Sequence, residues 1–174
     1  MSNNSVSGGL VGNSSSVPGV TAIDSSIVDT YATGSVDGSS VAGGLVGEMD
    51  QSSNTGDTIV ESSFATGELS SSTSTGGLVG SYSGSSVSGS YWDTESTGVA
   101  SSVTGTELTT SEMQGYTPSP DGSNTMSGLN FITTWDTVTG SYPILSSIDA
   151  TKQVDSPIVG GGGGGSGGVS VSST

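Results

Sequence analysis

Gly43-Gly44-Leu45-Val46-Gly47 is the stretch of sequence that decides the fold of this chain, because it occurs three times. The same five residues stand at positions 8–12 and again at positions 76–80. The leucines of the three copies lie 35 and then 33 residues apart. A period of this length is typical of proteins in which each repeat forms one structural unit stacked on the next.

A second motif accompanies this box. Tyr31-Ala32-Thr33-Gly34 returns as Phe64-Ala65-Thr66-Gly67 and, in altered form, as Tyr91-Trp92-Asp93-Thr94. The first two aromatic residues each precede the next leucine by 14 residues, whereas the distance from a leucine to the next aromatic residue falls from 21 to 19 to 13. One half of the repeat is therefore rigid and the other is a variable loop, as expected where insertions leave the stack.

The apolar residues alternate with a period of two, which indicates short strands. We expect the residues four positions before the aromatic ones to share their inward face, at Ile27, Val60 and Val87. Stacked repeats, about 4.8 Å apart, would form one column of aromatic residues and one of leucines: Tyr31 over Phe64 over Tyr91, and Leu10 over Leu45 over Leu78. The predicted fold is all-β, a right-handed parallel β-solenoid (β-helix) of about three repeats, with its handedness taken from the crossover rule.

The Gly-Gly-Leu-Val-Gly box with the Tyr-Ala-Thr-Gly strand resembles the GLUG motif, a repeat of large surface proteins of bacteria and haloarchaea. The run from Ser90 to Gly98, the run from Leu108 to Gln114, and the segments around Trp135 and Tyr142 also look like the region that closes such arrays. The resemblance covers roughly residues 5–146. It implies an extracellular β-helical stalk or adhesin-type region and carries no catalytic residues.

Three regions are predicted: GLUG-like repeats over 1–92, a capping region over 93–148, and a flexible Gly/Ser-rich linker over 149–174. In the capping region, Thr109 and Glu112 fit a capping box, which predicts a helical turn over about 110–114. The large aromatic residues Trp92 and Trp135 are what a cap would bury over the last open edge of the stack. The alternative is that these two tryptophans form a platform on which sugar rings stack.

Charge and composition exclude several functions. The chain has 174 residues, 16 of them acidic and only one basic, and it contains no histidine or cysteine. Histidine-activated nucleophiles and the usual zinc or haem sites are therefore excluded, and a single basic residue cannot neutralise the phosphates of a nucleic acid. The formal net charge of −15 predicts adaptation to high salt, because salt at about 1 M screens self-repulsion beyond roughly 3 Å.

Few residues are candidates for chemistry. Asp93 and Glu95 are two residues apart and would share one side of a strand, as an acid–base pair could, but solvated acids on a salt-adapted surface explain them equally well. No calcium-loop motif occurs among the acidic residues, and a solvated acidic surface explains their crowding in the first two repeats better than the alternative of weak divalent binding does. We therefore expect no catalytic residues, metal or cofactor. Asn3 and Asn13 begin Asn-x-Ser sequons and would accept glycans if the chain is exported.

We therefore expect a non-enzymatic, extracellular or cell-surface repeat region that acts as a stalk or adhesive scaffold. Adhesion would use the variable loops at 13–24 and 48–58, and the partners would be glycans or other surface proteins. No stretch approaches 18 consecutive apolar residues, so no membrane span is expected. No signal peptide is visible, so either the protein is not secreted by the usual route or, as we expect, this chain is a piece of a larger surface protein. The alternative function is a carbohydrate-binding or carbohydrate-acting β-helix that uses Trp92 and Trp135 together with the acids Asp93 and Glu95.

Overall fold

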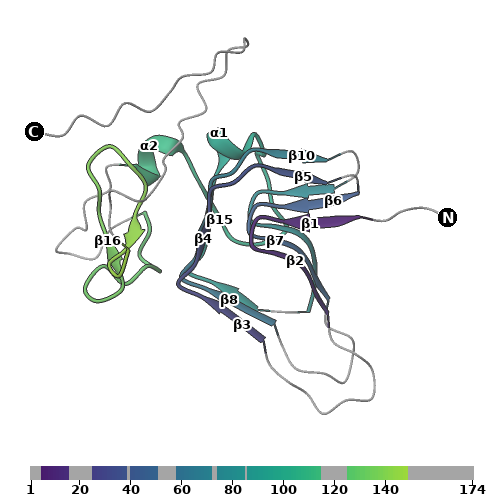
Figure 1. Ribbon diagram of the computed structural model, residues 1–174, viewed down its shortest axis with the longest axis horizontal. Helices are drawn as coiled ribbons and strands as arrows, with labels where there is room; N and C mark the ends of the chain where they lie inside the picture. Colours follow the sequence, from purple (N-terminus) through teal and green to yellow (C-terminus); the bar gives the residue numbers. More distant parts are fainter. Residues whose placement is uncertain are drawn as a thin grey trace, which may run out of the picture.

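The computed structural model describes residues 5–15, 25–38, 40–50, 58–71, 74–84, 86–114 and 125–148. Asn3, most of the two variable loops and the expected linker at 149–174 lie outside these residues. Within the described ranges the regular secondary structure consists of short strands and two helices of four residues each (Figure 1). The all-β prediction is confirmed.

Each repeat forms one turn of chain, which we call a coil. Coil 1 contains β1 (Val6–Gly8), β2 (Val11–Ser15), β3 (Ser25–Val28), β4 (Tyr31–Ala32) and β5 (Val36–Gly38). Coil 2 contains β6 (Val41–Gly43), β7 (Val46–Asp50), β8 (Thr58–Glu61), β9 (Phe64–Ala65) and β10 (Leu69–Ser71). Coil 3 contains β11 (Ser74–Gly76), β12 (Val79–Ser83), β13 (Ser86–Ser88) and β14 (Tyr91–Asp93).

Equivalent strands of the three coils pair in parallel. The sheets are β1-β6-β11, β2-β7-β12, β3-β8-β13, β4-β9-β14-β15 and β5-β10, where β15 spans Thr106–Leu108. Their register follows the sequence repeat, since Val46 pairs with Val11 on one side and with Val79 on the other. The unit that repeats in the sequence is therefore the unit that stacks in space, and the arrangement is consistent with a β-helix.

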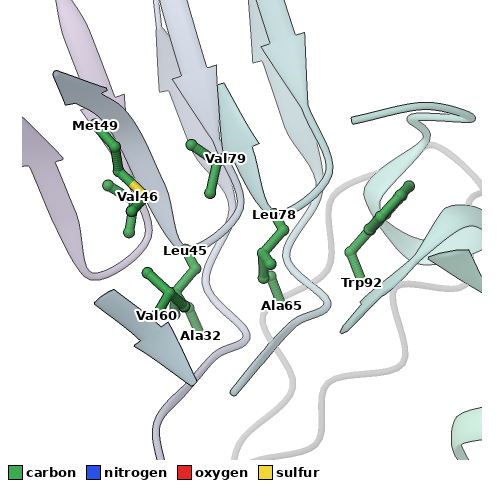
Figure 2. Close-up of a cluster of buried hydrophobic side chains, with 9 residues drawn as sticks. All are labelled: Ala32, Leu45, Val46, Met49, Val60, Ala65, Leu78, Val79 and Trp92. Atoms are coloured by element: carbon green, nitrogen blue, oxygen red, sulfur yellow. The ribbon is translucent and has the colours of Figure 1, made fainter. Parts of the chain in front are cut away.

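Both predicted columns are present. Tyr31 pairs with Phe64, which pairs with Tyr91, and the rings of Tyr31 and Phe64 stack with centroids 5.3 Å apart. In the leucine column, the Leu10 amide donates to the Leu45 carbonyl and the Leu45 amide donates to the Leu78 carbonyl. Leu45 and Leu78 are fully buried side by side (Figure 2).

The expectation that these aromatic residues share a face with Ile27, Val60 and Val87 is wrong. Those three pack in the interior with Leu45 and Leu78, whereas the aromatic column belongs to a second cluster on the opposite face of its sheet. A corner separates the two strands in each coil, at Asp29 (φ 51°), Ser62 (φ 49°) and Gly89 (φ 53°). Because this left-handed residue interrupts the extended backbone, the alternation of faces does not continue across the corner.

The second glycine of each box brings the coils close together. A Cβ atom at Gly44 would lie 2.1 Å from the Gly77 carbonyl oxygen, and one at Gly77 would lie 1.9 Å from Cδ1 of Trp92. Both separations are far below ordinary contact distance, so no other residue fits at these positions. Gly44 thereby lets the backbone of its coil lie against the next coil, and Gly77 lets the backbone lie against the indole of Trp92 in coil 3.

The expected capping region performs two separate tasks. Residues 98–108, the end cover, lie over the last coil, where Ser102 Oγ donates to the Val79 carbonyl and β15 pairs with β14. Residues 125–148, the side cover, contain β16 (Trp135–Asp136) and β17 (Ile144–Leu145) and lie beside the sheet that holds β4 and β15 (Figure 1). Only the end cover closes the stack as expected, because the side cover packs on the aromatic column.

The helices lie at the junction of the two covers. They are α1 (Thr94–Thr97) and α2 (Thr110–Met113), and the predicted capping box of α2 is confirmed. The Thr109 side chain accepts from the Glu112 amide, and the Glu112 carboxylate accepts from the Thr109 amide at 2.8 Å. These bonds satisfy amide groups that a helix of one turn otherwise leaves without partners.

Candidate functional site

Asp93 is the one fully buried carboxylate among the described residues, and four hydrogen bonds converge on it. One oxygen accepts from the amides of Glu95 and Ser96 at 2.8 and 3.1 Å, which caps α1. The other accepts from the Thr110 hydroxyl at 2.7 Å and from the Tyr142 hydroxyl at 2.6 Å. A buried carboxylate requires such donors, and here they join coil 3, both helices and the side cover.

Asp93 and Glu95 do not share a strand face as expected. The strand β14 ends at Asp93, and Glu95 is an exposed residue in the first turn of α1. Glu95 accepts a 2.9 Å hydrogen bond from the Thr110 amide and so ties the two helices together. The sequence could have predicted this helix, because Asp93 is a favourable N-cap residue and Gly98 is a favourable residue at the C-terminal end.

Two titratable groups here are shifted. Burial raises the pKa of Tyr142 to about 12, and the hydrogen bond to the Asp93 carboxylate adds to the increase. Hydrogen bonds from the backbone and side chain of Thr109 lower the pKa of Glu112. The raised pKa keeps Tyr142 protonated as a donor, and the lowered pKa keeps Glu112 ionised as an acceptor. Both shifts therefore accompany hydrogen bonds that hold the structure together.

Both tryptophans are interior residues. Trp92 is 3% exposed and donates to the Val99 carbonyl at 3.1 Å, so its indole lies between Leu78 and the end cover (Figure 2). Trp135 is 1% exposed and packs against the rings of Tyr31 and Phe64, at centroid distances of 6.0 and 5.4 Å. Neither indole presents a face on which a sugar ring could stack.

Trp135 also reaches the first coil. Its indole Nε1 donates to Asp29 Oδ1 at 3.2 Å, across 106 positions of sequence. At the equivalent corner of coil 2, Ser62 Oγ donates to the Gly128 carbonyl at 2.8 Å. The left-handed corners of successive coils are therefore the places where the side cover is hydrogen-bonded to the stack.

The acidic residues on the strands of the coils are separated from one another along the stack. Glu48 stands between Asn13 and Ser81, Asp50 between Ser15 and Ser83, and Glu61 between Val28 and Ser88, whereas Asp37 pairs with Ser70. The neutral neighbours also donate to the acids, since Asn13 Nδ2 lies 2.8 Å from Glu48 Oε2 and Ser88 Oγ lies 3.3 Å from Glu61 Oε1. In these pairs no acid stacks directly on another, which avoids repulsion at the spacing of neighbouring strands.

No ligand site emerges from these acids. Among the described residues, no three acidic side chains gather closely enough to hold a metal ion. A hollow beside α2 is lined by Glu107, Glu112 and neighbouring residues, and both of these carboxylates are exposed. Asn13 is exposed on β2, where its amide is hydrogen-bonded to Glu48, and the other sequon residue, Asn3, lies outside the described residues.

Comparison with known proteins gives one informative similarity. Over 120 residues, 68% of this chain, the sequence is 39% identical to Halomucin from Haloquadratum walsbyi. The chain spans about 1% of the length of that curated relative. No family model matches the chain, so the GLUG resemblance stays a prediction, and no solved structure matches it. In the described part of the chain, no helix is long and apolar enough to cross a membrane.

Proposed function

We propose that this chain is a non-enzymatic structural region of a haloarchaeal cell-surface or secreted protein, and that it works as a stalk or adhesive scaffold. The observation that carries the proposal is the in-register parallel pairing of equivalent strands across three coils. Such pairing supports a right-handed parallel β-solenoid of GLUG-like repeats, in which each coil contacts only its neighbours. Length along the stack then depends on the number of coils, at about 4.8 Å for each one.

The use of the polar side chains supports a structural role. Asp93, the buried carboxylate, accepts hydrogen bonds from three segments, which are α1, α2 and the side cover, and the tryptophans are buried in the packing. These residues stabilise the covers, and nothing in their placement favours the carbohydrate-acting alternative. The similarity to Halomucin of Haloquadratum walsbyi and the net charge of −15 support a salt-adapted surface protein.

The variable loops are the proposed adhesive surface, and the described strands locate where they begin and end. The first loop leaves β2 after Ser15 and the second leaves β7 after Asp50, and these two residues are paired in register. The loops return at Ser25 and Thr58, which are also paired. Both loops thus begin and end side by side on the stack, so a ligand could contact both.

The test of adhesion compares the parent chain with a variant in which residues 16–24 and 51–57 are replaced by short Gly-Ser linkers. Each protein is coupled to beads in high salt, and attachment of the beads to archaeal cells and to immobilised polysaccharides is measured. We expect the linker variant to keep its circular dichroism spectrum and lose attachment. Equal attachment of both proteins would remove adhesion from the proposal and leave a stalk.

Two further measurements test the non-enzymatic and surface assignments. Polysaccharides incubated with the chain should show no new reducing ends or unsaturated sugars, and tryptophan fluorescence should show no saturable change with oligosaccharides. Antibodies against the chain should label intact cells of the producing organism as strongly as permeabilised ones. Product formation would favour the carbohydrate-acting alternative, and labelling that requires permeabilisation would contradict the surface location.

A further inference from the structure

The two ends of the stack differ in how much apolar surface they expose. Leu10 in coil 1 is 50% exposed, although the equivalent residues Leu45 and Leu78 are both fully buried. Val11 is likewise partly exposed, whereas its equivalent in coil 2, Val46, is buried. In coils 2 and 3 these positions are covered by the preceding coil. In coil 1 the same positions are open to solvent.

The backbone shows the same difference. The Leu45 carbonyl accepts from the amides of Leu10 and Val11, and the Leu78 carbonyl accepts from those of Leu45 and Val46. Each coil therefore offers a carbonyl at the leucine of its box to the amides of the preceding coil. By this pattern the Leu10 carbonyl points out of coil 1 on the side away from coil 2. We call this side the open end of the stack, and β1, β2 and β3 are the edge strands of their sheets there.

The opposite end of the stack is closed. The end cover places Ser102 Oγ against Leu78 and Val79, and the Trp92 indole fills the space above Leu78. A second copy of this chain therefore cannot present its last coil to the open end of the first, because that coil is already covered. Two copies could meet only through their open ends, with their strands antiparallel, whereas all the coil-to-coil pairs in the described residues are parallel.

We propose that the open face of coil 1 is a stacking interface for a further coil of the same repeat on the same polypeptide. That coil would lie parallel and in register, with the second glycine of its box against Gly9, as Gly9 lies against Gly44 and Gly44 against Gly77. The stretch similar to this chain in Halomucin belongs to a polypeptide of which it is about 1%. The inference extends the proposed scaffold role, but it rests on strand register and holds whether or not the protein is at the cell surface.

The test adds one coil to the full chain. A copy of residues 41–73 replaces residues 1–5, so that it runs directly into Val6, and Leu10→Cys supplies the single thiol, since the chain has no cysteine. In the matched control the added copy carries Gly44→Val, whose side chain would collide with the carbonyl of Gly9 by the geometry seen between Gly44 and Gly77. The rate of maleimide labelling of the thiol is measured in high salt for the unextended chain and both extended forms.

The glycine extension should slow the labelling of the thiol at least about tenfold relative to the unextended chain and to the valine control, because burial makes labelling depend on local opening. Equal labelling rates in the two extended forms would overturn the proposal. The proposal would also be overturned if the unextended chain were labelled slowly and its labelling rate fell as the protein concentration rose. That result would show that a second copy of the chain covers this face. Fluorescence of the buried tryptophans monitors folding, and unfolding of the glycine extension alone would also count against the interface.

Discussion

The Tyr142 hydroxyl donates a 2.6 Å hydrogen bond to Asp93 Oδ2, and both side chains are buried. Tyr142 belongs to the side cover, and Asp93 is the last residue of β14 in coil 3. In the same side cover, the Trp135 indole donates to Asp29 in coil 1. The side cover is thus fixed to the first and last coils, and it holds the stack together along its length.

Tyr142→Phe should destabilise the fold, because it removes one donor from a buried carboxylate while it preserves the packing of the ring. Hydrogen bonds to charged groups contribute about 1.5–3 kcal/mol to the free energy of unfolding, so a loss of this order is expected. Denaturant unfolding in high salt measures the loss. Ile132→Ala, which truncates a side chain that is 94% exposed, is the surface control and should change stability little. An unchanged unfolding midpoint in Tyr142→Phe would show that this bond does not stabilise the cover.

The same contact predicts how stability depends on alkaline pH. The pKa of Tyr142 is about 12 in the folded chain, against an ordinary value of 10.0. The unfolded chain therefore loses this proton at lower pH than the folded chain does. The stabilisation is complete below about pH 10 and is lost as the pH rises toward 12. Unfolding of the parent and of Tyr142→Phe between pH 8 and 12 tests this, and parallel curves across the range would contradict it.

The repeats made the stacking readable from the sequence, whereas the side-chain directions across the corners of each coil and the contacts of the side cover were not. The equal spacing of Tyr31 and Phe64 to the next leucine predicted that these two residues pair. The capping box of Thr109 and Glu112 predicted the helical turn. The corner residues Asp29 and Ser62 adopt positive φ without being glycine, so only Gly89 signalled the change of face. The contact of Trp135 with the first coil has no local signal, because the segment that carries it occurs once.

The separation of acids in the stack predicts a charge-dependent defect. Ser81→Glu would place a second carboxylate beside Glu48, one strand spacing of about 4.8 Å away. Like charges in neighbouring strands destabilise by about 0.2–1 kcal/mol, and salt screens the effect. Ser81→Gln is the neutral control. The difference between the two variants in unfolding midpoint should be largest in dilute salt and vanish at several molar, and a difference that does not depend on salt would contradict the electrostatic explanation.

Gly77→Ala should be strongly destabilising, because its Cβ would lie 1.9 Å from Cδ1 of Trp92. Overpacking of this kind costs about 1–3 kcal/mol, and the backbone or the indole must move to relieve it. Gly34→Ala is the matched control, since a Cβ there meets nothing within 4 Å. Tryptophan fluorescence and thermal unfolding distinguish the two variants. Equal stability would mean that the close approach of Gly77 to the indole is not a constraint on the stack.

Salt should control whether the chain folds. Lys152, the only basic residue, lies outside the described residues, so no basic side chain offsets the carboxylates there. Repulsion at a net charge of −15 then opposes the compact state until salt shortens the screening length to roughly 3 Å near 1 M. Far-UV circular dichroism and tryptophan fluorescence, followed from dilute buffer to several molar salt, should show a β signal and burial of Trp92 and Trp135 appearing together.

Potassium chloride and sodium chloride should act alike in this titration, because screening depends on ionic strength. Sodium sulfate, compared at equal ionic strength, reveals any additional effect of salts that strengthen the burial of apolar surface. A chain that is fully folded in dilute buffer would show that stacking alone outweighs the repulsion, and the acidic surface would then serve solubility. A chain that is unfolded at every salt concentration would show that three coils and their covers do not suffice for stability.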